Sequence, residues 1–212
     1  MIVLRGTGKL MFDVVVIGGG HAGVEAANIA SQFQDLNVAI ITLPGVGLAS
    51  APCNPSVGGV GKGQVVRELD ALGGIMGKLA DISGIQFRTL NESKGHAVRS
   101  TRIQIDKFKY SENAELLMSQ YSNLRIIKEE VKNISGENNN FLVETKSSTW
   151  NAKKIIFTVG TFLNGKLHTG AVASAGGRVG CDATDSLVDF FKDINTLTAR
   201  FKTGTPARLK NT

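Results

Sequence analysis

Six consecutive residues near the amino terminus have the G-x-G-x-x-G spacing of a phosphate-binding turn: Gly18, Gly19, Gly20, His21, Ala22 and Gly23. In this motif the first glycine allows a sharp turn, the second lets backbone N–H groups approach a pyrophosphate, and the third lets helix and strand pack closely. The phosphates would lie at the positive N-terminal end of the following helix. The spacing therefore predicts a dinucleotide site at these six residues.

A strand must precede this turn and a helix must follow it. Residues 12–17 form an apolar, β-branched run typical of a strand buried in a parallel sheet. A second apolar run at residues 38–41 closes a βαβ unit of the ~30 residues that the motif requires. The helix between them is predicted to turn a face of mostly small residues toward the sheet: Ala22, Ala26, Ala27, Ala30 and Phe33.

The end of the second strand departs from this fingerprint. An acidic residue is expected there to bind a ribose 2′-hydroxyl, but the sequence has Thr42. A threonine hydroxyl can make the same bond, less strongly. The turn is therefore compatible with either FAD or NAD as ligand. The alternative interpretation is a glycine-rich turn in some other α/β domain.

Residues 43–63 form a glycine- and proline-rich segment longer than ordinary loops, whose median is about 4–6 residues. Its small residues would let backbone amides line a site. Cys53 is a candidate reactive thiol, because nearby amides and Lys62 would favour its thiolate; a small buried hydrophobic residue is the other interpretation. The segment lacks the G-x-x-x-x-G-K-[ST] pattern, which argues against ATP binding there.

Residues 90–106 combine guanidinium, ammonium, amide and hydroxyl donors around one glycine, as a site for a large polar ligand requires. The chain has two basic clusters, and two interpretations explain them. They form a solvated surface, or they bind an anion such as the flavin phosphates, a folate tail or nucleic acid. The clusters are Arg88, Lys94, Arg99, Arg102, Lys107 and Lys109, then Arg200, Lys202, Arg208 and Lys210.

The remaining periodicity completes the expected fold. Helices are predicted at 64–72, at 106–120 with Phe108, Leu116 and Leu117 on the apolar side, and from Asp182 or Thr184 to about Ile194. Strands are predicted at 84–90, 124–128, 131–135, 141–145 and 153–158, with a turn at 136–140. This order matches an α/β, Rossmann-like FAD-binding domain of the glutathione-reductase type with a β-meander.

The composition is that of a globular domain. The chain has 212 residues, 42% of them hydrophobic, and a net charge of +6. It contains no apolar run of the ~18 residues that span a bilayer, no secretory signal in residues 1–10, and no metal-ligand spacing around its two cysteines. We expect a cytoplasmic protein without membrane contact or metal, with residues 1–11 as an extension, 12–212 as one domain and 43–110 as a ligand-lining excursion.

Taken together, the chain closely resembles the N-terminal part of the GidA (MnmG) family of FAD-dependent tRNA uridine modification enzymes, from residue 12 to about Leu209. The resemblance rests on several specific stretches in order: residues 18–23 with His21, 53–63, 68–74, 90–106, 158–166 and 202–208.

The resemblance implies an activity and its co-reactants. With the GTPase partner MnmE, family members add a carboxymethylaminomethyl or aminomethyl group to carbon 5 of the wobble uridine of certain tRNAs. FAD is reduced by NADH, and methylene-tetrahydrofolate supplies the one-carbon unit. A homodimer is expected of the full-length form.

The resemblance also assigns residues. Residues 18–23 would bind the FAD pyrophosphate, with Thr42, Val131 and Thr184 as further cofactor contacts, and Cys53 would be the catalytic thiol. The substrate side would comprise Asn54, Lys62, Lys94, Arg99, Arg102, Lys202 and Arg208.

Family members are much longer than this chain, which ends before the later FAD-closing motif, a second cysteine and a helical C-terminal region. We therefore expect an incomplete FAD domain, truncated at the C-terminus. Two alternatives remain: the related folate- and FAD-dependent tRNA uracil methyltransferase, and a non-catalytic flavin-binding fragment. A disulfide reductase is disfavoured, because no second cysteine lies close to Cys53 in the sequence.

Overall fold

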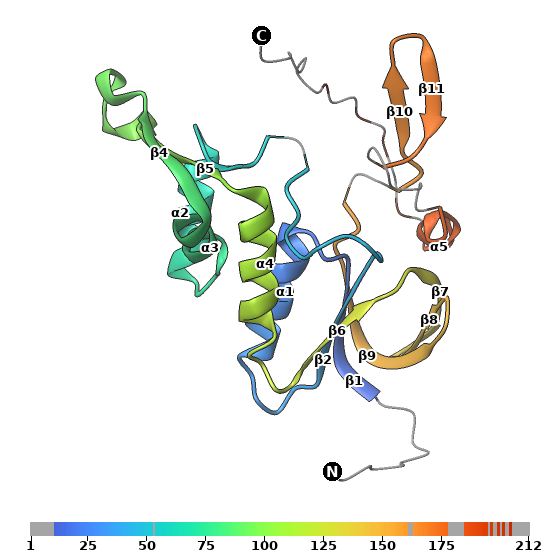
Figure 1. The fold of residues 1–212 in the computed structure, drawn as a ribbon. Helices are drawn as coiled ribbons and strands as arrows, with labels where there is room; N and C mark the ends of the chain where they lie inside the picture. Colours follow the sequence, from blue (N-terminus) through green and yellow to red (C-terminus); the bar gives the residue numbers. More distant parts are fainter. Residues whose placement is uncertain are drawn as a thin grey trace.

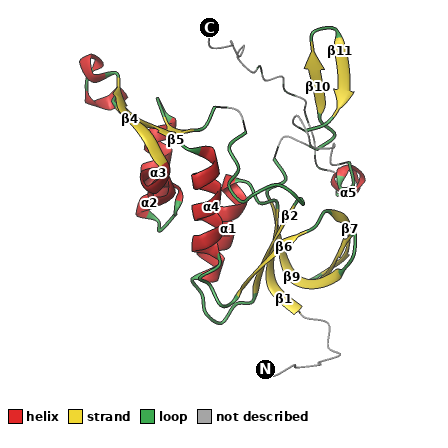
Figure 2. Ribbon diagram, viewed as in Figure 1, coloured by secondary structure: helices red, strands yellow, loops and turns green. Residues whose placement is uncertain are grey.

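The computed structural model describes residues 11–52, 54–160, 163–177 and 185–194, together with 196, 199, 201 and 204. Its centre is a six-stranded sheet in the order β6-β2-β1-β9-β8-β7 (Figure 1). Helices α1 (His21–Ser31) and α4 (Lys107–Met118) lie together on one side of the parallel strands of this sheet, and its antiparallel strands curl away on the other side (Figure 2).

The central sheet is parallel on both sides of β1 (Met11–Ile17). Its neighbours are β2 (Val38–Thr42) and β9 (Thr149–Phe157), and β6 (Leu124–Lys128) pairs in parallel with β2. Helix α1 (His21–Ser31) connects β1 to β2. The predicted βαβ unit is confirmed, and residues 124–128 belong to this parallel layer.

The meander consists of β7 (Val131–Glu137), β8 (Asn140–Thr145) and β9, paired antiparallel. Asn138 and Asn139 form its first turn, with φ of 51° and 66°. Two successive left-handed residues are the geometry of a two-residue type I′ hairpin, which asparagine tolerates well. The turn is therefore narrower than the predicted 136–140.

An excursion between β2 and β6 builds a second layer. Strands β3, β5 and β4 form a small antiparallel sheet in that order, and helix α4 returns the chain to the main sheet. The elements are β3 (Ser56–Gly58), α2 (Lys62–Ala71), α3 (Met76–Ser83), β4 (Gly84–Leu90), the 3₁₀ turns Glu92–Lys94 and His96–Val98, β5 (Ser100–Ile105) and α4 (Lys107–Met118). Sequence periodicity missed β3, α3 and β5.

Alternation along β1 divides the core in two. Val16 packs with α1, α4 and the excursion, whereas Val15 and Ile17 pack with the meander. All three side chains are buried, as expected of a strand covered on both faces. The glycine turn at residues 18–23 therefore follows a strand whose last three residues are buried.

Two predicted helix faces are right only in part: Ala27 on α1 is buried and Leu117 on α4 packs against the core, but other members of each face are exposed. Ala22 on α1 and Phe33 just beyond its end are exposed, and the buried face of α1 is Gly23, Val24, Glu25, Ala27, Asn28 and Ser31. On α4, Phe108 and Leu116 are 75% and 56% exposed, and Tyr110, Ala114 and Met118 are buried instead. Both segments are helices, as predicted, but each buries residues that the prediction did not place on its buried face. Packing against neighbouring elements decides which side of a helix is buried, and the hydrophobicity of its residues alone does not.

The last described elements are a two-stranded hairpin and a short helix: β10 (Lys166–Thr169), β11 (Val172–Ala175) and α5 (Val188–Asp193). The hairpin projects away from the sheet (Figure 1). Phe190 and Phe191 of α5 pack their rings against Phe157 of β9. The predicted caps Asp182 and Thr184 lie outside the described residues. Among the described residues, no helix is both long and apolar enough to cross a bilayer.

Candidate functional site

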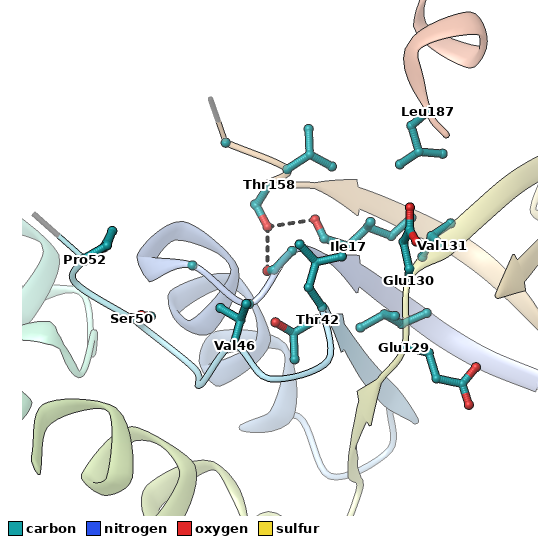
Figure 3. A pocket seen from close by; sticks show the side chains of 17 residues that line it. Ile17, Thr42, Val46, Ser50, Pro52, Glu129, Glu130, Val131, Thr158 and Leu187 are labelled. Carbon is teal, nitrogen blue, oxygen red and sulfur yellow. Dashed lines mark hydrogen bonds between the residues drawn. The ribbon is translucent and has the colours of Figure 1, made fainter. Parts of the chain in front are cut away.

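The glycine turn is held between the carboxyl ends of three parallel strands. The Gly18 N–H donates to the carbonyl of Ile41 at 2.8 Å, and the Thr158 N–H donates to the carbonyl of Ile17 at 2.8 Å. The Thr158 hydroxyl lies 3.0 Å from the Ile17 carbonyl and 2.9 Å from that of Gly18 (Figure 3). Strands β1, β2 and β9 therefore fix the path of the turn.

Three of the four glycines in the turn are required by the protein's own packing. A Cβ on Gly18 would lie 2.3 Å from the Thr158 carbonyl oxygen, and one on Gly19 would lie 2.4 Å from Thr42 Oγ1. A Cβ on Gly23 would lie 1.8 Å from the Gly18 carbonyl oxygen, which is why helix and strand can approach so closely here. Gly18 also has φ of +113°, which favours glycine.

Gly20 is different. It is exposed, its φ is −71°, and a Cβ there would meet nothing within 4 Å. Gly20 is also the N-cap of α1 and provides no side-chain acceptor for the first N–H groups of the helix. A bare, open helix N-terminus at the edge of a parallel sheet is the arrangement that binds phosphate.

A cavity of about 240 Å³ opens directly beside this turn (Figure 3). Residues 17–20 form its floor, and Thr42 and Val131 line it as the sequence predicted. Its other walls come from residues 158–160 after β9, Leu187 before α5, and Val46, Ser50 and Pro52 after β2. The cavity thus lies where the carboxyl ends of β1, β2 and β9 and the connection from β6 to β7 meet.

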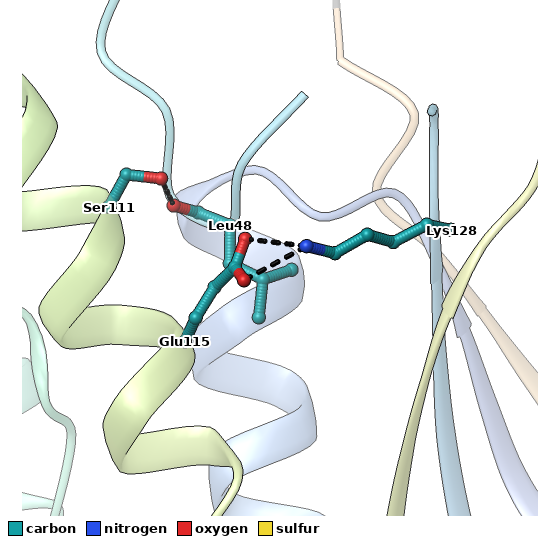
Figure 4. A network of polar contacts seen from close by, with 4 residues as sticks. All are labelled: Leu48, Ser111, Glu115 and Lys128. Atoms are coloured by element: carbon teal, nitrogen blue, oxygen red, sulfur yellow. Dashed lines mark hydrogen bonds and ion pairs between the residues drawn. The ribbon is translucent and has the colours of Figure 1, made fainter. Parts of the chain in front are cut away.

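The loop after β2 is tied down on both sides of the cavity. The Ala49 N–H donates to the Gly19 carbonyl at 2.8 Å, and the Ser111 hydroxyl of α4 donates to the carbonyl of the fully buried Leu48 at 2.7 Å. One turn further along α4, Glu115 accepts two hydrogen bonds from Lys128 of β6, at 3.1 and 2.9 Å (Figure 4). The start of the long loop is therefore an ordered wall of the site.

Two carboxylates that the sequence analysis did not single out line the cavity. Glu129 accepts hydrogen bonds from the Thr145 and Ser148 hydroxyls, and its side chain points away from the cavity (Figure 3). The Thr145 hydrogen bond holds the pKa of Glu129 below its ordinary value. Burial acts to raise the pKa of Glu130, but hydrogen bonds from Lys132 and Ser186 outweigh it and lower that pKa. Both carboxylates are thus already held by protein donors.

His21 supplies no positive charge to the cradle. Its ring centroid lies 5.6 Å from that of Tyr110, and burial lowers the pKa of His21 below its ordinary 6.5. The imidazole is therefore neutral at pH 7, and an anion at this turn would be held mainly by backbone N–H groups.

The predicted substrate-side residues that the structure describes stand on the excursion and do not line this cavity. Lys62 begins α2, Lys94 lies in the first 3₁₀ turn, and both are exposed. Arg99 donates from Nε and Nη2 to the Glu92 carbonyl, at 3.1 and 2.9 Å, and so closes the loop between β4 and β5. Asn54 and Arg102 lie at the β3–β5–β4 sheet. Cys53, Thr184, Lys202 and Arg208 lie outside the described residues.

The family follows from comparison with known proteins. A family model described as GIDA, Glucose inhibited division protein A, matches residues 13–212. The chain belongs to the GidA family. Two crystal forms of Aquifex aeolicus GidA, form II and form I, superimpose with TM-scores of 0.86 and 0.85, at 45% identity over 93% of this chain. The predicted membership and FAD-domain fold are confirmed.

The match spans 33% of the Aquifex GidA chain, so this chain corresponds to one third of that protein's length. The GidA-related protein from Thermus thermophilus has a TM-score of 0.54 at 17% identity, with 86% of this chain and 68% of that one covered. That likeness extends the fold beyond GidA proteins themselves. The predicted domain boundaries at residues 11, 43 and 110 stay predictions.

Proposed function

We propose that this chain is the FAD-binding part of a FAD-dependent tRNA-modifying enzyme. One observation carries the proposal: Gly20 presents an uncapped helix N-terminus to open space beside a cavity at the carboxyl edge of a parallel sheet. Membership of the GidA family supports the choice of FAD among dinucleotides.

The residues present fit such a cofactor. Backbone N–H groups at residues 18–20 and the first turn of α1 would bind the pyrophosphate. Thr42 and Val131 would contact the adenosine side, Thr42 through its hydroxyl and Val131 through its backbone. Bound FAD would supply a flavin ring that accepts and returns a hydride.

The substrate and partners are the finer part of the proposal. We assign the wobble uridine of tRNA as substrate, with methylene-tetrahydrofolate and NADH as co-substrates, MnmE as partner, a homodimeric full-length form and a cytoplasmic location. Cys53 would be the catalytic thiol, either adding to the pyrimidine or moving a proton. Its neighbour Pro52 lines the cavity, which supports a role near the flavin.

Two measurements test this function. The purified chain, titrated with FAD, should show saturable flavin binding by absorbance and fluorescence; a preparation that stays colourless contradicts the cofactor site. Mass spectrometry of tRNA nucleosides from a strain lacking the gene should show loss of the carboxymethylaminomethyl or aminomethyl modification of the wobble uridine. In a full-length context, Cys53→Ala should remove that modification and leave FAD bound.

A further inference from the structure

The three-stranded sheet of the excursion has two unlike faces. Val57, Ile103 and Ile105 alternate onto one face and belong to the core that includes α3 and α4. Because successive strand residues point to opposite faces, the residues between them lie on the other face. That second face is polar.

The strand registers arrange this polar face in two rows. Gly58 of β3 pairs with Arg102 of β5, which pairs in turn with Arg88 of β4. The next row is Ser56, Gln104 and Gln86. These two rows contain two guanidinium groups, two amides and a hydroxyl, and they contain no carboxylate.

The direct pairing of Arg88 with Arg102 needs an explanation. Side chains paired across antiparallel strands have Cβ atoms about 4.5–5.5 Å apart, and like charges in that position destabilise a sheet. In the part of the chain that the structure describes, the four ion pairs are all formed by lysines. No described carboxylate therefore offsets the repulsion between these two arginines.

An anion between the two guanidinium groups would remove the repulsion. Each guanidinium offers a planar fork of donors that matches the oxygens of a phosphate. Residues 84–109 carry six basic residues and two acidic ones, and the carboxylate of Asp106 already caps α4 through the N–H groups of Phe108 and Lys109. The local field therefore favours an anion.

The surroundings favour a nucleotide over a simple anion. The amides of Gln86 and Gln104 can donate to and accept from base edges. Gly58 is a glycine because its φ is +87° and a Cβ there would lie 2.2 Å from the Thr101 carbonyl oxygen, so its end of the row carries no side chain.

This face also adjoins the flavin cavity. Asn54 Oδ1 accepts a hydrogen bond of 3.3 Å from Gln104 Nε2, and Pro52 lines the cavity. The Cα atoms of Pro52 and Asn54 are at most about 7 Å apart, because an extended chain rises about 3.3–3.6 Å per residue. The Gln104 end of the polar face therefore lies near the cavity wall at Pro52.

We propose that Arg88 and Arg102 together bind a backbone phosphate of the RNA substrate on the polar face of the β3–β5–β4 sheet. The inference rests on the proposed function, because it takes tRNA as the substrate. It adds Arg88, whose basic cluster the sequence analysis left open between a solvated surface and an anion site, and it assigns Arg102, predicted on the substrate side, to a phosphate. Arg99, which closes its own loop, is not part of this site.

Fluorescence anisotropy with a labelled anticodon stem-loop RNA tests the proposal on the whole chain at several salt concentrations. Arg88→Gln and Arg102→Gln should each weaken binding about tenfold, and the double variant should lower the slope of log K against log salt by about one, as the loss of one phosphate contact does. The double variant should lose less than the product of the two, because both side chains bind one phosphate.

Arg67→Gln is the matched control. This variant makes the same charge change on α2, where Arg67 donates a hydrogen bond to Thr101 Oγ1 on the opposite side of the sheet. Its RNA affinity should therefore stay within about twofold of that of the parental chain. Arg88→Gln should also unfold at the same or a higher urea concentration, since it removes a like-charge pair. Improved stability together with weaker RNA binding is a result that loss of folding cannot produce.

Four other outcomes overturn the inference. In the first three, the parental chain does not bind RNA, the parental and Arg88→Gln proteins bind it equally, or Arg67→Gln loses as much RNA affinity as Arg88→Gln does. The fourth is displacement of the RNA by saturating FAD, which would assign the arginines to the flavin diphosphate. Flavin titration of the same samples reports separately on the proposed function: a chain that binds RNA as expected but no FAD contradicts the cofactor site alone.

Discussion

The carboxylate of Glu25 accepts a hydrogen bond of 2.7 Å from the backbone N–H of Met76, which joins the helix of the phosphate cradle to the first turn of α3. The Ile75 N–H lies 3.1 Å from each oxygen of the same carboxylate. Glu25 is 9% exposed, and α3 has no side-chain cap of its own. Glu25 therefore caps α3 from another element and ties the excursion to the cradle.

Replacing Glu25 with alanine should lower the free energy of unfolding by about 2–3 kcal/mol, because two buried N–H groups lose a charged acceptor. Urea denaturation followed by circular dichroism measures the change. Glu68→Ala, at an exposed position of α2, is the control and should change stability by less than about 0.5 kcal/mol. Equal effects of the two substitutions would show that the cap contributes nothing.

The role of Glu25 was beyond prediction from local sequence. Its partners are 50 and 51 residues away, and nothing in the helix period marks a glutamate that turns inward. Helix α3 was missed for the same reason. It has eight residues, and the acceptor that usually announces a helix start stands on a different helix.

Gly20→Val should weaken FAD binding at least tenfold, about 1.4 kcal/mol, while leaving the fold intact. The new Cβ meets no protein atom within 4 Å and suits the local φ of −71°, but the side chain occupies the space through which phosphate reaches the helix N-terminus. Flavin fluorescence titration measures binding, and thermal unfolding without FAD measures the fold.

Gly19→Ala is the companion to that experiment. Its Cβ would lie 2.4 Å from Thr42 Oγ1 and 2.9 Å from Leu48 Cδ2, so this variant should lose stability even without the cofactor. If Gly20→Val destabilises the chain as much as Gly19→Ala does, or binds FAD normally, the turn is not the cradle.

Thr42→Val should weaken FAD binding about three- to tenfold. The substitution removes the hydroxyl of a buried residue but keeps its shape, so it should cost one neutral hydrogen bond of about 1 kcal/mol. Equilibrium dialysis with FAD and with riboflavin separates the causes. Riboflavin lacks the adenosine ribose, so its affinity should not change. A loss shared by both ligands would mean that the substitution distorts the cavity.

The sequence predicted the local part of the site well. Strand, glycine turn and helix are adjacent in the chain, and their glycines are dictated by contacts within one βαβ unit. Thr42 ends a strand of the parallel sheet and lines the cavity, and Val131, which the family resemblance assigned, lines it too; their contact with a cofactor stays a prediction. Glu129 and Glu130 were missed, since their position depends on how the meander folds back.

The register of β4 with β5 could not be read from the sequence either. The two strands are joined by an irregular connection with two 3₁₀ turns, so no hairpin type fixes which residues pair. Arg88 and Arg102 consequently looked like two members of a dispersed basic cluster. Only the three-dimensional pairing places them side by side.

Asp13 gives a pH-dependent prediction. Its carboxylate accepts a 2.8 Å hydrogen bond from the Asn37 N–H and pairs with Lys153 at 2.7 Å, and these contacts lower its pKa from 3.8. The contribution of this carboxylate to stability is therefore fully present above the pKa that Asp13 has in the unfolded chain. It is lost as the pH falls through the lower pKa that Asp13 has in the folded protein. Asp13→Asn should cost about 1 kcal/mol at pH 7, and the difference should shrink progressively below pH 3.8. Urea denaturation across this range, with exposed Asp35→Asn as control, measures it. A difference independent of pH would assign the effect to side-chain shape rather than charge.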